Sequence, residues 1–352
     1  MIGVPQAEIA VRRRRRRQPT GRASCRDRAL RIVEVSVVAV PSKTAASVGF
    51  RTGGVYLITG GLGALGLFVA RYLLQHYQAK VVLTGRSALS AEKQQLLHSL
   101  DPSAQQLQYL SCDICDLSAV QAMVTQLAQR GLALNGVLHS AGVIEDNFIL
   151  RKDFAAFQRV ISPKVRGTLN LDIATREQPL DLFVLFSSVT GVLGNLGQCD
   201  YAYGNAFEDY FSLQRNALAA QGECSGHAVS INWPYWQDGG MVLSAAETEI
   251  LRKNFGLVPL QNEPGLQALE FAVTAGVGQL AVLPGDAAKV QQVLGVRPWS
   301  ADACSDLARL VTSPSLVASS AAAASAAVDV HVTQTEVALS AAVLKTQAVA
   351  YL

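Results

Sequence analysis

Three side chains of this sequence could together transfer a proton to an oxygen atom. Ser188 ends an apolar run, and Tyr201 opens a segment with helical spacing. A tyrosine hydroxyl can donate a proton, and a nearby ammonium such as that of Lys164 favours the phenolate and eases the transfer. A hydroxyl beside them can hold a carbonyl in place. The combination suits the reduction of a ketone, because a delivered hydride leaves an alkoxide that needs a proton.

A glycine-rich segment lies between an expected strand and an expected helix. The apolar run 55–59 predicts a buried strand, and apolar residues with helical spacing begin at Leu65. Gly61, Gly63 and Gly66 have the spacing of dinucleotide-binding loops. A phosphate can approach a backbone without Cβ atoms, and the N-terminus of a helix attracts it. The residues expected to contact a dinucleotide here are Thr59, Gly60, Gly61, Gly63, Leu65 and Gly66.

Further cofactor contacts are expected where later strands end. Arg86 and Ser87 follow the second strand, where a site for NAD commonly has an acidic residue. A guanidinium with a neighbouring hydroxyl suits a 2′-phosphate and favours NADPH over NADH, although a solvated surface arginine is the alternative. The loops after the third and fourth strands reach the same edge and are expected to line the adenosine end, with Asp113, Ser140, Ala141 and Gly142.

The elements that must position these residues alternate between strands and helices. Apolar runs predict further strands at 80–84, 107–110, 135–139, 181–187, 227–232 and 280–283. Helices are expected at 91–100, 117–130, 151–177 and 201–221. Strands that are apolar throughout are buried on both faces, and alternation with helices implies parallel crossovers. The sequence therefore predicts an α/β fold of Rossmann type, a doubly wound parallel sheet with helices on both faces.

The two ends differ from this core. Residues 1–52 show no period and contain the run Arg12–Arg17, which predicts a disordered basic segment; a targeting signal is the alternative. The domain is expected over 53–296, followed by an Ala/Ser-rich linker over 297–334. Residues 335–352 are interpreted as a helix that stops midway. Both ends are expected to be truncated.

Composition limits the classes of partner and compartment. The net charge of +3 lies mostly in the N-terminal arginine run, so no nucleic-acid surface is expected. No uninterrupted apolar stretch is long enough for a membrane helix. The six cysteines suggest reduced thiols in a soluble, cytoplasmic protein. Cys112 and Cys115 have the spacing of a redox pair or half a zinc site, but no second pair completes a metal set, so no metal is expected.

The order of these motifs resembles a known family. Ser188 followed by Tyr201 at a helix start is similar to the short-chain dehydrogenase/reductase superfamily. Asn205 four residues after that tyrosine, with Lys164 on the preceding helix, resembles the ketoreductases of modular polyketide synthases over about 53–296. The resemblance implies that Tyr201 donates the proton, Ser188 binds the ketone, Lys164 favours the phenolate and Asn205 orders a relay water.

The same resemblance implies a substrate and partners. NADPH would reduce a β-ketoacyl thioester on an acyl carrier protein to the β-hydroxyacyl thioester, within a synthase that supplies further domains. Asp146 follows the Ser140–Gly142 segment, and Leu193 stands where A-type enzymes have tryptophan, which implies a B-type enzyme and a D-configured alcohol. The alternative role for Asp146 is to cap the helix that follows. Trp233 and Met241 belong to segments that open the substrate lid in such domains.

Two departures from the family leave other functions open. The upstream structural subdomain usual in these ketoreductases is not found in residues 1–52, so an exposed apolar contact face is expected. Residues 335–352 resemble the approach to a carrier protein, without its phosphopantetheine-bearing serine motif. The alternatives are a non-catalytic domain that retains the fold, and a free-standing short-chain reductase of small metabolites.

Overall fold

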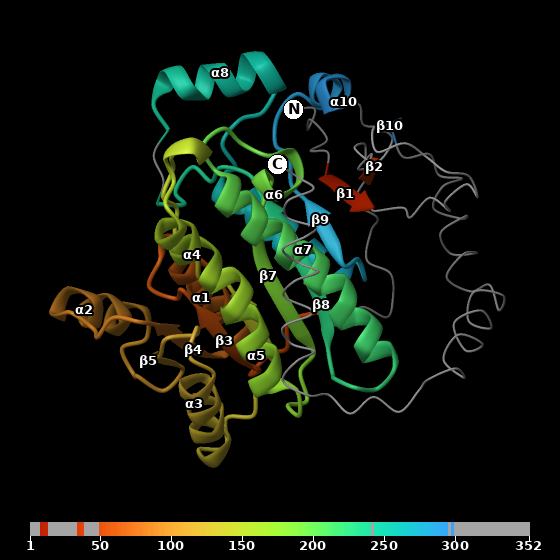
Figure 1. The fold of residues 1–352 in the computed structure, drawn as a ribbon. Coiled ribbons are helices and arrows are strands. Elements are labelled where there is room, and N and C mark those ends of the chain that lie inside the picture. The colour runs from red at the N-terminus through yellow and green to blue at the C-terminus, as the bar shows by residue number, and fades with distance from the viewer. Residues whose placement is uncertain (1–7, 13–33, 39–48, 241–242, 295–296, 299–352) are drawn as a thin grey trace. The chain divides into compact units, whose positions relative to one another are not determined.

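The computed structural model describes residues 8–12, 34–38, 49–240, 243–294 and 297–298. Its centre is a parallel sheet with the strand order β9-β8-β7-β6-β3-β4-β5 (Figure 1). These strands are β3 (Val55–Thr59), β4 (Lys80–Gly85), β5 (Leu107–Ser111), β6 (Gly136–His139), β7 (Leu182–Ser188), β8 (His227–Trp233) and β9 (Gln279–Ala281). The predicted doubly wound α/β fold is confirmed.

Helices cover both faces of this sheet. They are α1 (Ala64–Tyr77), α2 (Ala91–Leu100), α3 (Leu117–Gln129), α4 (Phe154–Ser162), α5 (Thr168–Thr175), α6 (Thr190–Leu193), α7 (Cys199–Ala220), α8 (Ala245–Phe255), α9 (Asn262–Thr274) and α10 (Ala287–Leu294). Successive side chains of a strand point to opposite faces. In β7, Val184 therefore packs into the cluster that contains α1 and α9, whereas Phe183 packs into the cluster that contains α3 and α5.

The strand order places a crevice at the carboxyl end of β3. This strand pairs with β4 on one side and with β6 on the other. The chain runs outward from β3 through β4 to β5, and then crosses to β6. Ligands bind in open α/β sheets where the direction of winding reverses, because the two adjacent loops separate there. The glycine-rich segment after β3 lies at this point.

The helix predicted over 151–177 is interrupted. Between α4 and α5, Pro163–Gly167 form a π-helical turn, and a short 3₁₀ turn, Ile149–Arg151, precedes α4. Pro163 has no amide hydrogen to donate within a helix, so an α-helical hydrogen bond is lost there. A π turn changes the direction of the side chains that it carries, and such turns are frequent at functional sites. Lys164 lies in this turn and is buried.

The prediction of no regular structure over 1–52 is wrong for two segments. Strand β1 (Glu8–Arg12) pairs antiparallel with β2 (Glu34–Val38) and with β9. The β2 sequence mostly alternates polar and apolar residues, and β1 has three apolar residues between charged ones, but five residues beside a long arginine run are a weak signal. Phe50 is also only 8% exposed and belongs to the core, so the domain begins before residue 53.

The predicted linker also needs a correction at its start. Arg297–Pro298 form strand β10, which pairs parallel with β2. The rest of the linker and the predicted helix at 335–352 lie outside the described residues, as does most of the arginine run.

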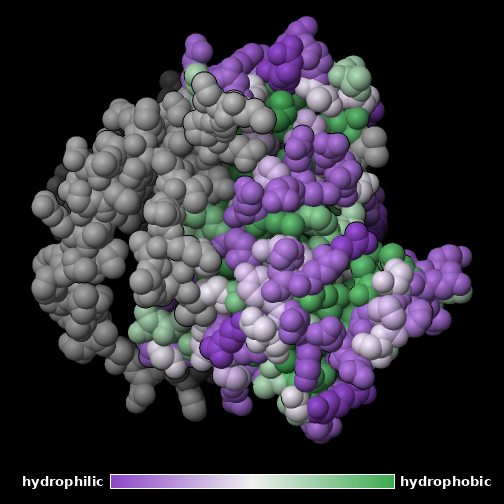
Figure 2. All heavy atoms as spheres, turned by 180° about the vertical axis from the view of Figure 1, so that it is seen from behind, coloured by the Kyte–Doolittle hydropathy of each residue, from purple (hydrophilic) through white to green (hydrophobic). Residues whose placement is uncertain are grey.

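The described surface is largely polar on the side that Figure 2 shows, with apolar residues between the polar ones. Helices α5 and α7 carry large apolar side chains that are about 40–50% exposed: Leu169, Ile173, Tyr210 and Leu213. No helix in the described part of the chain is long and apolar enough to span a membrane.

Phe50 provides a test of the corrected domain boundary. Its ring packs edge-on against Tyr56 and Tyr77, with ring centroids 5.3 and 5.5 Å away. Phe50→Ala is expected to lower the free energy of unfolding by about 3 kcal/mol, measured by urea denaturation of the full chain, because it leaves a cavity in the core. Phe148→Ala, at a 55% exposed phenylalanine, should change it by no more than about 0.5 kcal/mol. Equal effects would place Phe50 outside the core.

Candidate active site

The structure brings Lys164 to Tyr201 at the carboxyl end of β7. The Lys164 ammonium is buried and donates hydrogen bonds to the carbonyl oxygen of Phe186 at 3.0 Å and to Glu208 Oε2 at 2.8 Å. Its Nζ atom lies 5.8 Å from the centroid of the Tyr201 ring. Gly204, one helical turn after Tyr201, packs directly on the Lys164 side chain, where a Cβ would come within 3.2 Å of Lys164 Cβ. Glycine therefore lets α7 approach the π turn.

Helix α7 carries the tyrosine and the asparagine in its first turns. Asn205 Nδ2 donates to the carbonyl oxygen of Tyr201 at 2.7 Å, and the side chain is fully buried. Its Oδ1 is buried without a hydrogen-bond partner among the described residues. A buried acceptor of this kind is usually satisfied by a water or a bound group. This observation fits the relay water that the sequence predicted for Asn205.

Ser188 is the last residue of β7 and is half-buried. Its carbonyl oxygen accepts a hydrogen bond from Asn232 Nδ2 at 3.0 Å, and its Oγ accepts one from the backbone N–H of Thr190 at 3.2 Å. The following turn packs closely on α7, since a Cβ on Gly191 would lie 2.9 Å from Asn205 Cβ. The four predicted catalytic residues therefore come from β7, the π turn and α7, which are in mutual contact.

Burial dominates the electrostatics of this region. Burial alone would lower the pKa of Lys164, but the nearby Glu208, Tyr201 and Asp209 together outweigh it and the pKa is raised. Burial raises the pKa of Glu208, while the adjacent Lys164 ammonium opposes this shift and favours the carboxylate. Burial and the Lys164 charge lower the pKa of His139 to about 3, so that its ring is neutral. Lys164 thus remains an ammonium beside Tyr201.

The glycine-rich loop leaves no room for side chains at three positions. Gly60 has φ of +63°, and a Cβ there would lie 2.8 Å from Ala141 Cα. A Cβ on Gly61 would lie 2.7 Å from Leu83 Cβ, and one on Gly66 would lie 2.8 Å from Gly60 O. Gly63 precedes α1 and is exposed, whereas Leu65 is half-buried and packs against the core. The three glycines therefore let the loop pack closely against β4 and the segment after β6, at the N-terminus of α1, where a pyrophosphate would bind.

The segment after β6 connects this loop with Lys164. The Ser140 hydroxyl donates to the carbonyl oxygen of Thr59 at 2.8 Å, and the Ala141 N–H donates to Thr59 Oγ1 at 3.3 Å. A Cβ on Gly142 would lie 3.4 Å from Lys164 Cε. The segment after β6 thus lies between the end of β3 and Lys164, next to residues expected to hold the dinucleotide and to one expected to catalyse.

Arg86 and Ser87 follow β4 at the same edge of the sheet and are exposed. The Tyr109 hydroxyl donates to the carbonyl oxygens of Gly85 at 2.9 Å and Ser87 at 2.5 Å, which holds this loop. Asp113 is exposed after β5 and accepts a hydrogen bond from the Cys115 N–H at 2.9 Å. The backbone is fixed while the Arg86 guanidinium stays accessible to a ligand.

Of the predicted substrate-side residues, Asp146 and Leu193 lie in exposed positions near the start of α7. Both Asp146 carboxylate oxygens accept from Gln198 Nε2 at 3.0 Å, so this residue is held against the loop before Tyr201. Leu193 is 42% exposed at the end of α6. Met241 lies outside the described residues.

The expected substrate contact of Trp233 needs a correction. The indole is only 4% exposed and packs against Phe186 and Trp236, with ring centroids 5.6 and 5.0 Å away. It belongs to the main hydrophobic cluster. As the last residue of β8, its side chain points to the face that α1 and α9 cover, which favours a packing role.

A buried ion pair fixes the approach to Tyr201. Lys152 Nζ donates to Asp200 Oδ2 at 2.5 Å and to the carbonyl oxygen of Glu145 at 2.6 Å. Asp200 also accepts from the Tyr201 N–H at 2.9 Å. Both charged side chains are almost completely buried. The loop that carries Asp146 is thereby tied to the first turn of α7.

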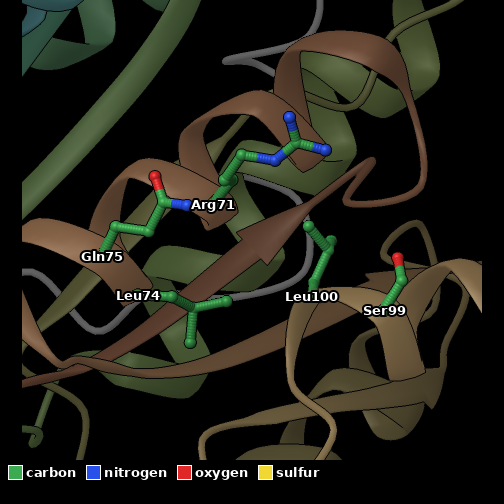
Figure 3. A pocket seen from close by; sticks show the side chains of 5 residues that line it. All are labelled: Arg71, Leu74, Gln75, Ser99 and Leu100. Carbon is green, nitrogen blue, oxygen red and sulfur yellow. The ribbon is translucent and has the colours of Figure 1, made fainter.

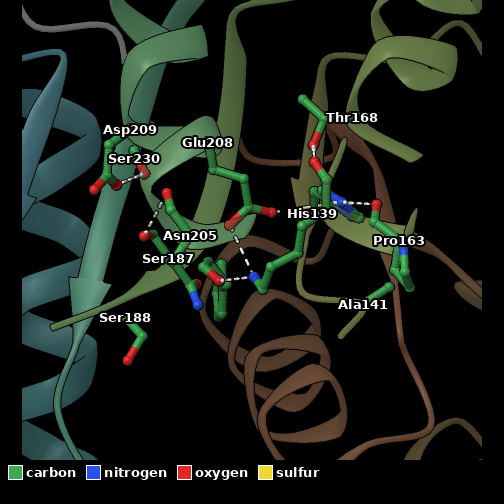
Figure 4. A network of polar contacts seen from close by, with 12 residues as sticks. His139, Ala141, Pro163, Thr168, Ser187, Ser188, Asn205, Glu208, Asp209 and Ser230 are labelled. Carbon is green, nitrogen blue, oxygen red and sulfur yellow. Dashed lines mark hydrogen bonds and ion pairs between the residues drawn. The ribbon is translucent and has the colours of Figure 1, made fainter. Parts of the chain in front are cut away.

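Sequence reasoning missed the polar residues behind the site. His139 Nδ1 lies 2.6 Å from Thr59 Oγ1, and its Nε2 lies 3.1 Å from the carbonyl oxygen of Pro163 (Figure 4). Glu208 contacts Lys164, and Asp209 accepts from Ser230 and Asn232. One signal was present, since residues 201, 205 and 208 share a helical face. No motif marks a buried carboxylate on that face.

The alternative sites find little support. Cys112 is buried and Cys115 half-buried, and burial raises the pKa of both thiols, that of Cys115 to about 11. No group of metal-binding side chains occurs among the described residues. A hollow of about 250 Å³ lies between α1 and α2, lined by Arg71, Leu74, Gln75, Ser99 and Leu100 (Figure 3). These residues lie in the later turns of both helices, remote from the glycine loop at the start of α1.

The chain is similar to known proteins over its described core. Residues 54–238 match the KR domain family. The chain is 39% identical over 257 residues to polyketide synthase PksN of Bacillus subtilis (strain 168), covering 73% of this chain and 5% of that protein.

Solved structures are similar as well. A ketoreductase domain from the bacillaene assembly line has a TM-score of 0.70 and 37% identity, covering 74% of this chain and 63% of that one. An N-terminal ketoreductase from the macrolactin assembly line has a TM-score of 0.65 and 37% identity, covering 75% of this chain and 50% of that one.

The glycine loop yields a binding prediction. Gly60→Ala is expected to weaken NADPH binding at least about tenfold in a fluorescence titration, because the added Cβ displaces Ala141 from the crevice. Gly222→Ala is the matched control, since Gly222 also has positive φ, +79°, but nothing lies within 4 Å of the added Cβ. The control should bind NADPH as wild type does. Equal affinity of both variants would place the dinucleotide elsewhere.

Proposed function

Because the chain belongs to the KR domain family, we propose that it reduces a β-ketoacyl thioester to the β-hydroxyacyl thioester with NADPH. The observation that carries the proposal is the buried Lys164 ammonium, 5.8 Å from the Tyr201 ring and close to Gly142 in the segment that contacts the end of β3. A non-catalytic domain would have no need to bury a charge beside a tyrosine in a cofactor crevice. A bound nicotinamide cofactor supplies the hydride.

The chain's own residues then manage the proton and the carbonyl. Tyr201 donates its phenolic proton to the developing alkoxide, and Ser188 orients the ketone oxygen by a hydrogen bond. The Lys164 ammonium stabilises the phenolate that remains, because an adjacent positive charge favours the ionised form. Asn205, with its unpartnered Oδ1, holds a water that returns a proton to the site.

The preference for NADPH is supported by Arg86. Its guanidinium is exposed directly after β4, and Ser87 stands beside it on a loop held by Tyr109. A 2′-phosphate at this position gains a charge-assisted contact that the ribose hydroxyl of NADH cannot provide. Asp113, Ser140, Ala141 and Gly142 would line the remaining adenosine and nicotinamide contacts.

We further propose a B-type product, the D-configured alcohol. Gln198 donates hydrogen bonds to Asp146 just before α7, and Leu193 stands at the position where A-type enzymes have tryptophan. The substrate would arrive on an acyl carrier protein. The relative PksN is a polyketide synthase of which this chain spans about 5%, so the neighbouring domains of a synthase are the expected partners.

Activity of the full chain tests the reaction. Wild type is expected to oxidise NADPH with a β-ketoacyl N-acetylcysteamine thioester and to give the D-configured alcohol on chiral analysis. Tyr201→Phe should lower kcat about 100-fold or more, since it removes the general acid, while NADPH binding is retained. Tyr203→Phe, two residues further along α7, is the control and should keep kcat. A folded wild type that binds NADPH without turnover would favour the non-catalytic alternative.

Cofactor choice has a separate test. Arg86→Ala is expected to raise KM for NADPH about tenfold and to leave KM for NADH nearly unchanged, because only the 2′-phosphate contact is lost. Arg130→Ala removes another exposed arginine, far along α3, and should alter neither constant. If Arg86→Ala affects both cofactors equally, the preference arises elsewhere.

A further inference from the structure

Glu208 is a fully buried carboxyl group for which the proposed reaction has no role. It lies on α7, and its Oε2 accepts a hydrogen bond from Lys164 Nζ at 2.8 Å. Its Oε1 has no hydrogen-bond partner among the described residues and lies 3.6 Å from His139 Nε2. Burying a carboxylate is costly unless a partner compensates it. Lys164 is the compensating partner here.

Lys164 in turn needs Glu208, because its ammonium is buried as well and requires hydrogen-bond acceptors. The ammonium has three hydrogens to donate, and Phe186 O and Glu208 Oε2 accept two of them. These two acceptors come from β7 and α7, so they fix the direction of the side chain from two sides. The remaining hydrogen is left for the crevice that holds the Tyr201 ring, 5.8 Å from Nζ.

Helix geometry links Glu208 to the catalytic residues. Tyr201, Asn205 and Glu208 follow each other at intervals of four and three residues and share one face of α7. The helix thus presents the proton donor, the relay residue and the carboxylate to the same crevice. A displacement of Lys164 would change its distance to Tyr201 directly.

We propose that Glu208 is a positioning residue for the reduction, which holds the Lys164 ammonium against the crevice so that it faces Tyr201. The inference rests on the proposed function, because it assigns a role within that reaction. Glu208 acts through Lys164 and touches neither substrate nor cofactor. Its loss should therefore affect the chemical step more than binding.

The sign of the pH effect follows from the charges around the pair. The groups that face it are His139 from β6, which is neutral, together with Tyr201 and Asp209 from α7. An ionised Glu208 favours the protonated form of Lys164. Replacing it with a neutral side chain makes the Lys164 ammonium lose its proton at lower pH, so the alkaline limb of the kcat profile should move to lower pH.

Two substitutions distinguish the role of Glu208 as a hydrogen-bond acceptor for Lys164 from the effect of its negative charge. Glu208→Leu removes the acceptor and is expected to lower kcat about 10- to 100-fold, with KM for NADPH and thioester within about threefold of wild type. Glu208→Gln keeps an acceptor oxygen and should retain most of kcat at neutral pH, while its alkaline limb moves down by about one pH unit. Wild-type kcat and pH profile in both variants would overturn the proposal.

A matched control separates this effect from simple loss of stability. Asp172 is another buried carboxylate, which accepts from Arg215 Nε at 3.0 Å in a buried ion pair on α5. Asp172→Asn should lower the thermal unfolding midpoint but leave kcat and its pH profile as in wild type. If Asp172→Asn lowers kcat as much as Glu208→Leu does, Glu208 has only a structural role.

A double-mutant cycle tests that Glu208 acts through Lys164. The double variant Lys164→Met/Glu208→Leu should have the same kcat as Lys164→Met alone. Its thermal unfolding midpoint should be higher than that of Lys164→Met, because the double variant buries no unpaired Glu208 carboxylate. Multiplicative losses of kcat would overturn the proposal. If the wild type does not turn over, the proposed function has failed. The unfolding midpoints still test the pair in that case, because additive losses in the double variant would contradict a Lys164–Glu208 interaction.

Discussion

The constraint on which the site depends is the burial of the Lys164 ammonium. An unpaired charge in the interior is strongly destabilising, so the chain must supply acceptors wherever it places this side chain. Phe186 O from β7 and Glu208 from α7 do so at 3.0 and 2.8 Å. The π turn at Pro163–Gly167 carries Lys164, and Gly204 lets α7 pack directly on the lysine side chain, so both features help to hold the ammonium in its buried position.

The cofactor loop is part of the same polar framework. Thr59, at the end of β3, contacts His139, and His139 lies beside both Pro163 and Glu208 (Figure 4). The carbonyl oxygen of Pro163 can only accept, so His139 Nε2 donates to it and Nδ1 accepts from the Thr59 hydroxyl. A neutral ring satisfies both contacts. The glycine loop and the catalytic lysine are therefore positioned by one buried network.

Most of the central fold could be predicted because β3 to β9 are short apolar runs separated by amphipathic segments. The glycine loop could be predicted because its spacing between a strand and a helix is characteristic, and Ser188, Lys164 and Tyr201 because their side chains suit proton transfer to a ketone. Asn205 was named through the family resemblance. Strands β1 and β2 were not predicted, since β1 pairs with β9 and β2 pairs with β10, which lie far away in the chain. Trp233 and Glu208 show a further limit: which side of a strand or helix is buried depends on neighbours that local sequence does not specify.

The central claim is that this crevice transfers a hydride to a ketone carbon. The most direct measurement is mass spectrometry of the product formed by the full chain from a β-ketoacyl thioester and NADPH deuterated at the transferred position of its nicotinamide ring. The account predicts one deuterium on the carbon that carried the ketone. A product without deuterium on that carbon, or no product from folded protein that binds NADPH, would contradict it.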